Sequence, residues 1–233
     1  MSSPLSANLV IRADAGLQMG TGHVMRCLAL AEPWLQSGSR VTFVSSNLSR
    51  PLIERIQNLG IKTASLRALP GSHDDAIELT QIAAEREASW VVVDGYHFGA
   101  EYQLALKEAG TKFLFFDDFG HAKNYSADFI LNQNLGAAAK LYSHREPQTK
   151  LLLGPRYVQL RGEFDHWRNW RRSICPQAKN VLVTLGGSDS ENVTLKVIQT
   201  LKLIPSHDAS VVVGNNNPHR KILAAALQDS PHL

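Results

Sequence analysis

The sequence predicts an α/β protein built on a doubly wound parallel sheet. Short runs of β-branched and aromatic residues alternate with longer helical patterns along most of the chain, which is typical of βαβ units. Two of the runs, VVV at residues 91–93 and FLFF at residues 113–116, are apolar without alternation. Strands that are covered on both faces have this composition, so we expect parallel strands with helices on both sides of the sheet.

The predicted elements follow one another in regular order. We expect strands at residues 8–12, 40–44, 62–66, 90–93, 112–116 and 129–131. We expect helices between them near residues 23–37, 50–59, 75–87 and 99–109. The segment at residues 151–172 breaks this rhythm with Gly154-Pro155 and a polar, Trp-rich stretch. We therefore predict that residues 1–172 hold a first Rossmann-like domain and its connection to a second.

The βα pattern restarts after the connection. Strands at residues 180–185 and 209–213 alternate with helices at 191–203 and 218–228, so residues 173–233 are predicted to be part of a second Rossmann-like domain. Two strands and two helices are too few to close a three-layer core of ordinary size. We expect this domain to be truncated, with a naturally short protein that dimerises across its open edge as the alternative. The segment after Lys179 is expected to be less stable than the first domain and to be a possible site of self-association.

Composition limits the class of partner. The 24 basic and 21 acidic residues give a net charge of +3, which is too balanced to predict a nucleic-acid or membrane surface. Residues 1–4 lack the basic and apolar regions of a secretory signal, and no apolar run is long enough to span a bilayer. The two cysteines, Cys27 and Cys175, form no redox or zinc motif. We expect a cytoplasmic protein with reduced thiols and a small-molecule partner.

Polar residues gather after three of the predicted strands, at residues 14–23, 94–97 and 117–121. In open α/β sheets, ligands bind beyond the carboxyl ends of the strands. All three clusters are predicted on that same edge, so we expect the functional site there.

The first cluster combines a glycine loop with the start of a helix. Gly20 and Gly22 allow a close approach of the backbone to a ligand, and the helix that follows offers free N–H groups to a phosphate. The loop lacks the third glycine of the dinucleotide fingerprint and has no P-loop lysine. His23 begins the helix, where the helix dipole disfavours imidazolium and favours a proton acceptor. Arg26 shares its face and is placed to contact an anionic substrate. The alternative is that His23 only caps the helix and Arg26 is solvated.

The other clusters admit two interpretations. Asp94, His97, Asp117 and His121 are all possible ligands of a divalent ion. They stand on separate loops without a compact ligand spacing, and Tyr96 among them better suits a platform for a sugar or a base. We therefore predict no metal site and no cofactor.

A further glycine turn, Gly186-Gly187-Ser188, follows the first strand of the second domain. Such a turn is suited to hold a diphosphate through its backbone N–H groups. The alternative is an ordinary tight turn between a strand and a helix.

Several of these motifs recur, in the same order, in a known family. They are Arg12-Ala-Asp14, the GTGHVMRCLALA run from Gly20, Asp94-Gly-Tyr96, Asp117-Asp118, Leu153-Gly-Pro-Arg156-Tyr157, Leu160-Arg161-Gly-Glu163-Phe164 and Leu185-Gly-Gly-Ser-Asp189. With them, residues 8–192 resemble the UDP-sugar hydrolases of pseudaminic acid biosynthesis, which release a diacetamido-trideoxy-altrose from UDP.

The resemblance implies a GT-B fold, with two Rossmann-like domains around a cleft. It also implies that His23 is a general base that activates water to attack the anomeric carbon with inversion, without a metal ion. Single-base hydrolysis is chemically reasonable because UDP is a good leaving group. Members of the family continue beyond the last residues of this sequence with a Gly-rich loop and further strands.

Residue patterns and resemblance together predict three sets of site residues. The catalytic residue is His23. The substrate-binding residues are Arg12, Asp14, Gly20, Thr21, Gly22, Arg26, Tyr96, Asp117 and Arg161. The nucleotide-binding residues are Gly186, Gly187 and Ser188.

Two other functions remain open at this point. A sugar transferase on the same fold replaces water with an acceptor hydroxyl, and the fold alone does not separate the two. A catalytically incomplete nucleotide-sugar-binding fragment is the second alternative, favoured by the short second domain.

Overall fold

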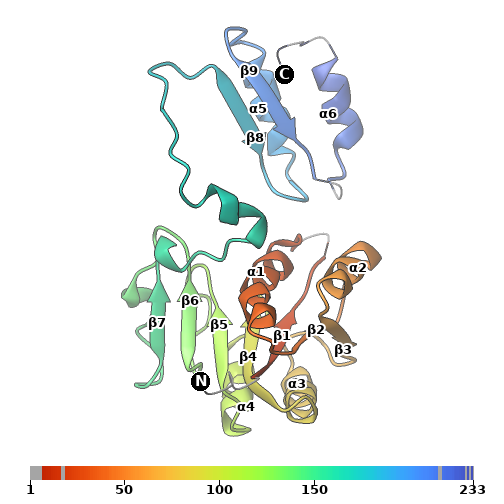
Figure 1. Cartoon of the computed structure of the whole chain (residues 1–233). Coiled ribbons are helices and arrows are strands. Elements are labelled where there is room, and N and C mark those ends of the chain that lie inside the picture. The colour runs from red at the N-terminus through yellow and green to blue at the C-terminus, as the bar shows by residue number, and fades with distance from the viewer. Residues whose placement is uncertain (1–6, 17–18, 215–216, 229, 231, 233) are drawn as a thin grey trace. The chain divides into compact units, whose positions relative to one another are not determined.

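The computed structural model describes residues 7–16, 19–214, 217–228, 230 and 232. The chain forms two compact units, which Figure 1 shows in colours that run along the sequence. Unit 1 comprises Met1–Ala15 and Gly22–His166, and unit 2 comprises Gly16–Thr21 and Trp167–Leu233. The domain boundary placed between residues 172 and 173 by the sequence stays a prediction.

The centre of unit 1 is one parallel sheet. Its strands are β1 (Asn8–Ala13), β2 (Val41–Ser45), β3 (Lys62–Ser65), β4 (Ala88–Asp94), β5 (Phe113–Phe116), β6 (Phe129–Asn132) and β7 (Lys150–Leu153). They lie in the order β3-β2-β1-β4-β5-β6-β7, and every pairing is parallel. The order reverses its direction between β1 and β4, as in a doubly wound fold. The predicted fold class is therefore confirmed.

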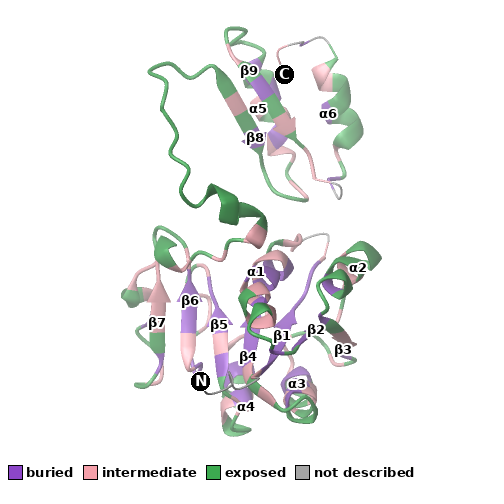
Figure 2. Cartoon of the chain, in the orientation of Figure 1, coloured by how far each residue is buried: buried purple, intermediate pink, exposed green. Residues whose placement is uncertain are grey.

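Helices cover both faces of this sheet. On one face, α1 (Gly22–Gln36) and α2 (Arg50–Asn58) pack on strand residues such as Ile11 and Phe43. On the other face, α3 (His73–Glu85) and α4 (Ala100–Glu108) pack on residues such as Val93 and Phe113. The central strands are buried on both faces, as Figure 2 shows, which explains why their sequences do not alternate.

The sequence-based prediction was wrong about β7. It assigned residues 151–172 to the interdomain connection, whereas Lys150–Leu153 pairs with β6 as the last strand of the sheet. Residues 151–153 are Leu-Leu-Leu, an apolar run like those of the central strands, although β7 as an edge strand is half exposed. The turn at Gly154-Pro155 comes directly after this strand and hid it.

Short 3-10 turns join the remaining elements of this region. They span Ala139–Tyr142, Pro155–Tyr157 and Gly162–Trp167.

Unit 2 contains a smaller sheet. Its strands β8 (Asn180–Thr184) and β9 (Asp208–Val212) pair in parallel, and its helices are α5 (Val193–Leu201) and α6 (Arg220–Leu227). The buried cluster of this unit consists of Val183, Leu201 and Ala209. On the opposite face, Leu182 is 68% exposed and Val212 is 54% exposed. The lower stability expected for the segment after Lys179 stays a prediction.

Among the described residues, no helix is long and apolar enough to cross a membrane. Both cysteines are free, with Cys27 buried and Cys175 exposed.

Candidate functional site

The carboxyl ends of the central strands bring three of the predicted polar groups into one network. Asp94 is the last residue of β4 and lies beside Ala13 of β1 and Phe116 of β5 in the sheet register. Asp118 follows β5 closely, and His23 is the second residue of α1, which follows the loop after β1. The sheet thus positions side chains that are far apart in the sequence.

A short hydrogen bond joins His23 to Asp94. The distance from His23 Nδ1 to Asp94 Oδ1 is 2.6 Å, and the Asp94 side chain is fully buried. Arg26 also approaches Nδ1, but at 3.3 Å, so the bond to the carboxylate is the stronger one. Nδ1 therefore donates its proton to Asp94, and Nε2 carries the lone pair of the neutral ring.

Arg26 holds the Asp94 carboxylate from the other side. Its Nε donates to Asp94 Oδ2 and its Nη2 to Asp94 Oδ1, both at 2.6 Å. Burial by itself raises the pKa of Asp94, but the hydrogen bonds from Arg26 and His23 outweigh burial and hold that pKa below its usual value. Asp94 therefore stays a carboxylate beside His23, and a proton taken up by the imidazole is balanced by a fixed negative charge.

Asp118 extends the network to an aromatic ring. Arg26 Nη1 donates to Asp118 Oδ1 at 2.7 Å, and the Tyr96 hydroxyl donates to Asp118 Oδ2 at 2.9 Å. Asn134 adds a third bond to Asp118, at 3.0 Å. The ring of Tyr96 meets that of His23 edge to face, with centroids 4.8 Å apart. Burial and the bond to Asp118 raise the pKa of Tyr96 to about 12, so its phenol is neutral at pH 7.

Asp117, although adjacent in sequence, lies in a separate contact set. Its Oδ2 accepts from the Tyr125 hydroxyl, and its Oδ1 accepts the backbone N–H groups of Phe119 and Gly120. His121 Nδ1 lies 3.2 Å from the same carboxylate. Burial raises the pKa of Asp117, but these partners outweigh it and lower that pKa strongly. Asp117 is thus engaged in holding its own loop, and its predicted contact with the substrate stays a prediction.

Arg12 and Asp14 belong to a buried ion cluster of their own. Arg12 is completely buried and bonds to both carboxylate oxygens of Asp75, at 3.1 and 2.8 Å. It also lies 2.7 Å from Asp14, whose other oxygen is 3.2 Å from His97 Nε2. This geometry gives both residues a structural role at the end of β1. Direct contact of either with a substrate stays a prediction.

The glycine loop is described in part. Gly16 and Gly20 exchange backbone hydrogen bonds of 3.2 and 2.7 Å, and Gly20 has a φ of +72°. Gly22 begins α1, and Thr21 stands just before it. A Cβ at Gly20 or Gly22 would meet no described atom within 4 Å, so the backbone there is open. The loop residues Leu17 and Gln18 lie outside the described residues.

Arg161 contacts residues outside the His23 network. Its Nη2 is 3.3 Å from Glu163, and its guanidinium lies over the Phe164 ring at 5.4 Å. These contacts join neighbours in the sequence, and its predicted substrate contact stays a prediction.

In unit 2, the turn Gly186-Gly187-Ser188 follows β8 as expected. Asp189 accepts the backbone N–H groups of Val193 and Thr194 at 2.9 Å, so part of the α5 N-terminus is already capped. Nucleotide binding by the turn stays a prediction.

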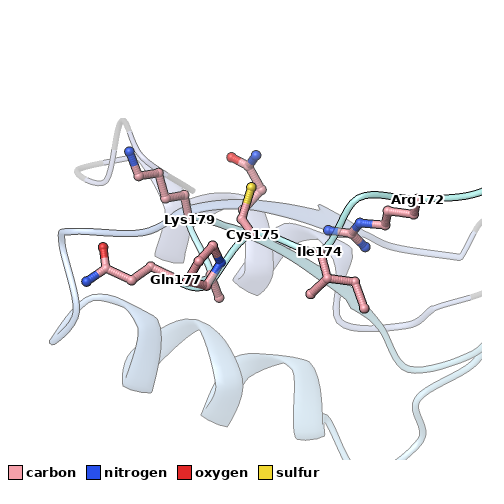
Figure 3. Close-up of a pocket in the computed structure, with 8 residues that line it drawn as sticks. Arg172, Ile174, Cys175, Gln177 and Lys179 are labelled. Carbon is pink, nitrogen blue, oxygen red and sulfur yellow. The ribbon is translucent and has the colours of Figure 1, made fainter.

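Two further features of the described residues concern metal binding and cavities. No group of three or more His, Cys, Asp or Glu side chains among them is placed to hold a metal ion. A hollow of about 710 Å³ in unit 2 is lined by the segment that leads into β8, including Arg172, Cys175 and Lys179 (Figure 3). It contains none of the predicted site residues.

Comparisons with known proteins identify relatives of the chain. No protein-family model matches the sequence. The chain is 27% identical over 220 residues to the UDP-2,4-diacetamido-2,4,6-trideoxy-beta-L-altropyranose hydrolase of Campylobacter jejuni, which covers 92% of the chain and 72% of the hydrolase. An uncharacterized protein of Methanocaldococcus jannaschii is 27% identical over 83% of this chain, which spans 39% of its length. Spore coat polysaccharide biosynthesis protein SpsG of Bacillus subtilis is 24% identical, over 95% of the chain and 63% of its own length.

Solved structures identify the fold. MurG of Acinetobacter baumannii matches 96% of the chain with a TM-score of 0.56 and 14% identity, over 63% of its own length. Anabaena HepE in complex with UDP and glucose matches 96% with a TM-score of 0.59 and 13% identity, over 68% of its length. The fold is of the GT-B type. The chain spans about two thirds of these GT-B structures.

Two residues of the His23 network, Asp94 and Asp118, were not among the predicted site residues. Both stood in the polar clusters that the sequence placed at the carboxyl edge of the sheet. His23, at the start of the helix after β1, bonds to Asp94 at the end of the neighbouring strand β4, and the place of Asp94 in the second polar cluster was the signal for this pairing. The choice between Asp117 and Asp118 depends on which way each side chain points, which the sequence pattern does not show.

Proposed function

We propose that this chain carries the catalytic residues of a UDP-sugar hydrolase, with His23 as the general base that activates water. The observation that carries the proposal is the 2.6 Å bond between His23 Nδ1 and the buried Asp94, at the sheet edge where α/β folds bind ligands. The sequence similarity to a hydrolase of a UDP-linked sugar supports the substrate class. A GT-B structure that holds UDP and glucose supports it further.

In the proposed reaction, His23 Nε2 takes a proton from water as the water oxygen bonds to the anomeric carbon. The bond from that carbon to the diphosphate oxygen breaks, and UDP leaves with the electron pair. Attack on the face opposite the leaving group inverts the anomeric configuration. The charge of the imidazolium is balanced by Asp94, which Arg26 keeps ionised.

Arg26 has a more limited role in this proposal than a direct clamp on the substrate. All three of its guanidinium nitrogens contact Asp94 or Asp118. We propose that Arg26 positions Asp94, and that Asp94 in turn positions His23. The stabilisation of the departing diphosphate is assigned to the free backbone N–H groups at the start of α1.

A glycosyltransferase is the second candidate, because structures with this fold include the MurG protein. The same base would then deprotonate an acceptor hydroxyl instead of water. Incubation with UDP-sugars without an acceptor separates the two, since a hydrolase releases free sugar and UDP in equal amounts.

The experiment that tests the base replaces His23 with Ala or Asn. We expect turnover of a UDP-sugar substrate to fall by roughly two to four orders of magnitude, because general-base catalysis contributes this much. Binding of the substrate should change far less, because the base acts in the transition state. Turnover is measured by UDP release, and binding by calorimetry.

His144→Ala serves as the matched control, because His144 is an exposed histidine of the same unit. It should turn over substrate at the wild-type rate. Near-normal turnover in the His23 variants would contradict the assignment and leave His23 as a helix-terminal residue that only holds Asp94.

A further inference from the structure

Tyr96, which contacts the His23 ring, and its neighbour Phe119 are both open to solvent. Tyr96 is 47% exposed and Phe119 is 57% exposed, and their ring centroids lie 5.3 Å apart. Tyr96 also contacts the His23 ring edge to face. Exposed aromatic rings that adjoin one another next to a polar site offer an apolar surface to a ligand.

The Phe119 ring stands on a fixed turn. Asp117 accepts the backbone N–H groups of Phe119 and Gly120 at 2.7 and 2.6 Å. Gly120 has a φ of +78°, and a Cβ there would lie 3.0 Å from the Leu141 carbonyl oxygen, so the turn requires glycine. The His121 ring packs against Phe119 with centroids 5.7 Å apart. The exposed ring is thus held in place before any ligand arrives, which lowers the entropy cost of binding.

The charged groups nearby are already paired with one another. Arg26 is bonded to Asp94 and Asp118, and the Tyr96 hydroxyl is bonded to Asp118. Arg26, Asp118 and the Tyr96 hydroxyl are thus engaged with one another, and the exposed rings of Tyr96 and Phe119 remain as apolar surface for a ligand. Methyl and C–H groups of a ligand gain from packing on such faces, whereas a hydroxyl that loses water there gains no partner.

We propose that Tyr96 and Phe119 form a platform that selects sugars whose hydroxyls are replaced by methyl-bearing groups, with Phe119 as the specificity-determining residue. This inference rests on the proposed function, since it places the sugar beside His23. It assigns the sugar preference to a surface that the reaction itself does not require. Phe119 contacts the substrate without taking part in proton transfer.

The test compares two substrates in the full chain: a UDP-linked 2,4-diacetamido-2,4,6-trideoxyhexose and UDP-N-acetylglucosamine, which keeps hydroxyls at C4 and C6. In Phe119→Ala, we expect kcat/KM for the first to fall about tenfold or more, as loss of an apolar contact predicts. For UDP-N-acetylglucosamine it should change little, so the discrimination between the substrates collapses. Phe119→Tyr keeps the ring and should keep the preference. Leu104→Ala, which removes a 47% exposed side chain from α4, is the control and should change neither value.

A binding measurement separates this inference from the proposed reaction. In saturation-transfer NMR with the first substrate, the sugar methyl protons should receive strong saturation from the wild-type protein, and lose it relative to the uridine protons in Phe119→Ala. Methyl saturation without sugar release would contradict hydrolysis and support the platform. Equal saturation in the two proteins, no methyl saturation in the wild type, or an equal fall of kcat/KM for both substrates would overturn the platform.

Discussion

Asp94 bonds to both His23 and Arg26, and the two partners have different effects in the proposed chemistry. Its Oδ1 accepts the Nδ1 proton of His23, which leaves Nε2 as the proton acceptor. Both of its oxygens accept from Arg26, which keeps the carboxylate ionised. Substitutions of Asp94 and of Asp118 distinguish these two effects, because only Asp94 contacts the histidine.

We expect Asp94→Asn to lower kcat by roughly three to four orders of magnitude, as wrong-tautomer variants of such pairs do. The amide donates to Nδ1 and so moves the imidazole proton to Nε2, where it blocks general-base action. Asp118→Asn is the matched comparison, since it weakens the hold on Arg26 but leaves the His23 bond. Steady-state kinetics with folding checked by circular dichroism should give a much smaller loss for Asp118→Asn. An equal loss in both variants would indicate that the ion network matters only for structure.

The sequence indicated where these residues gather but not how they pair. Periodicity and strand order place the residues after β1, β4 and β5 at one edge, and the structure brings His23, Arg26 and Tyr96 together there. Asp117 and Asp118 bond to different partners because the turn that follows β5 directs their side chains differently. Such a turn depends on side-chain direction and on a contact with Tyr125, which the pattern of strands and helices does not indicate.

At the scale of elements, the central strands were predictable because burial on both faces leaves a plain apolar run in the sequence. The helices were predictable because their apolar residues recur with the helical period. β7 has an apolar run too, Leu151-Leu152-Leu153, but it was missed because Gly154-Pro155 follows it directly and indicated a connection. Its place is fixed by pairing with β6, a non-local contact.

The turn before α3 gives a prediction at this scale. Gly71 has a φ of +77°, and a Cβ there would lie 2.3 Å from the carbonyl oxygen of His97. Its N–H also donates to Asp75, the partner of Arg12. We expect Gly71→Ala to destabilise the protein by more than the roughly 1–2 kcal/mol that an alanine costs in the left-handed region, because it adds a backbone clash. Chemical denaturation measures the difference.

Gly60→Ala is the matched control for this substitution. Gly60 has nearly the same φ, +78°, but a Cβ there would meet no atom within 4 Å. It should show only the conformational cost. Equal losses of stability in the two variants would mean that a Cβ at Gly71 does not clash with the backbone of His97.

At the scale of the whole molecule, the two units differ in how many carboxylates have a lowered pKa. Asp14, Asp94, Asp117 and Asp118 all lie in unit 1, and in each the surrounding partners overcome burial and lower the pKa. In unit 2, the pKa of Asp189 is lowered too, at a helix terminus near the surface. The stability of unit 1 therefore depends on more ionised carboxylates, which acid protonates, than the stability of unit 2.

We expect unit 1 to lose stability as the pH falls below about 4. A carboxyl with a lowered folded-state pKa contributes its full stability above the unfolded value of about 3.9 and loses it as pH falls toward the folded value. Thermal unfolding between pH 7 and pH 3 should show this decline. Asp14→Asn should be less stable at pH 7 but less sensitive to acid. A melting temperature that is independent of pH over this range would contradict the ionised networks described here.

The most direct test of the proposed hydrolysis is to follow the water oxygen into the products. Hydrolysis of a UDP-sugar is run in oxygen-18 water, and the products are analysed by mass spectrometry during the first turnovers. If water activated by His23 attacks the anomeric carbon, as proposed, the label enters the free sugar, UDP is unlabelled, and proton NMR shows the inverted anomer first. Label in UDP would show attack at phosphorus, and retention of configuration would show a covalent route; either result contradicts the account.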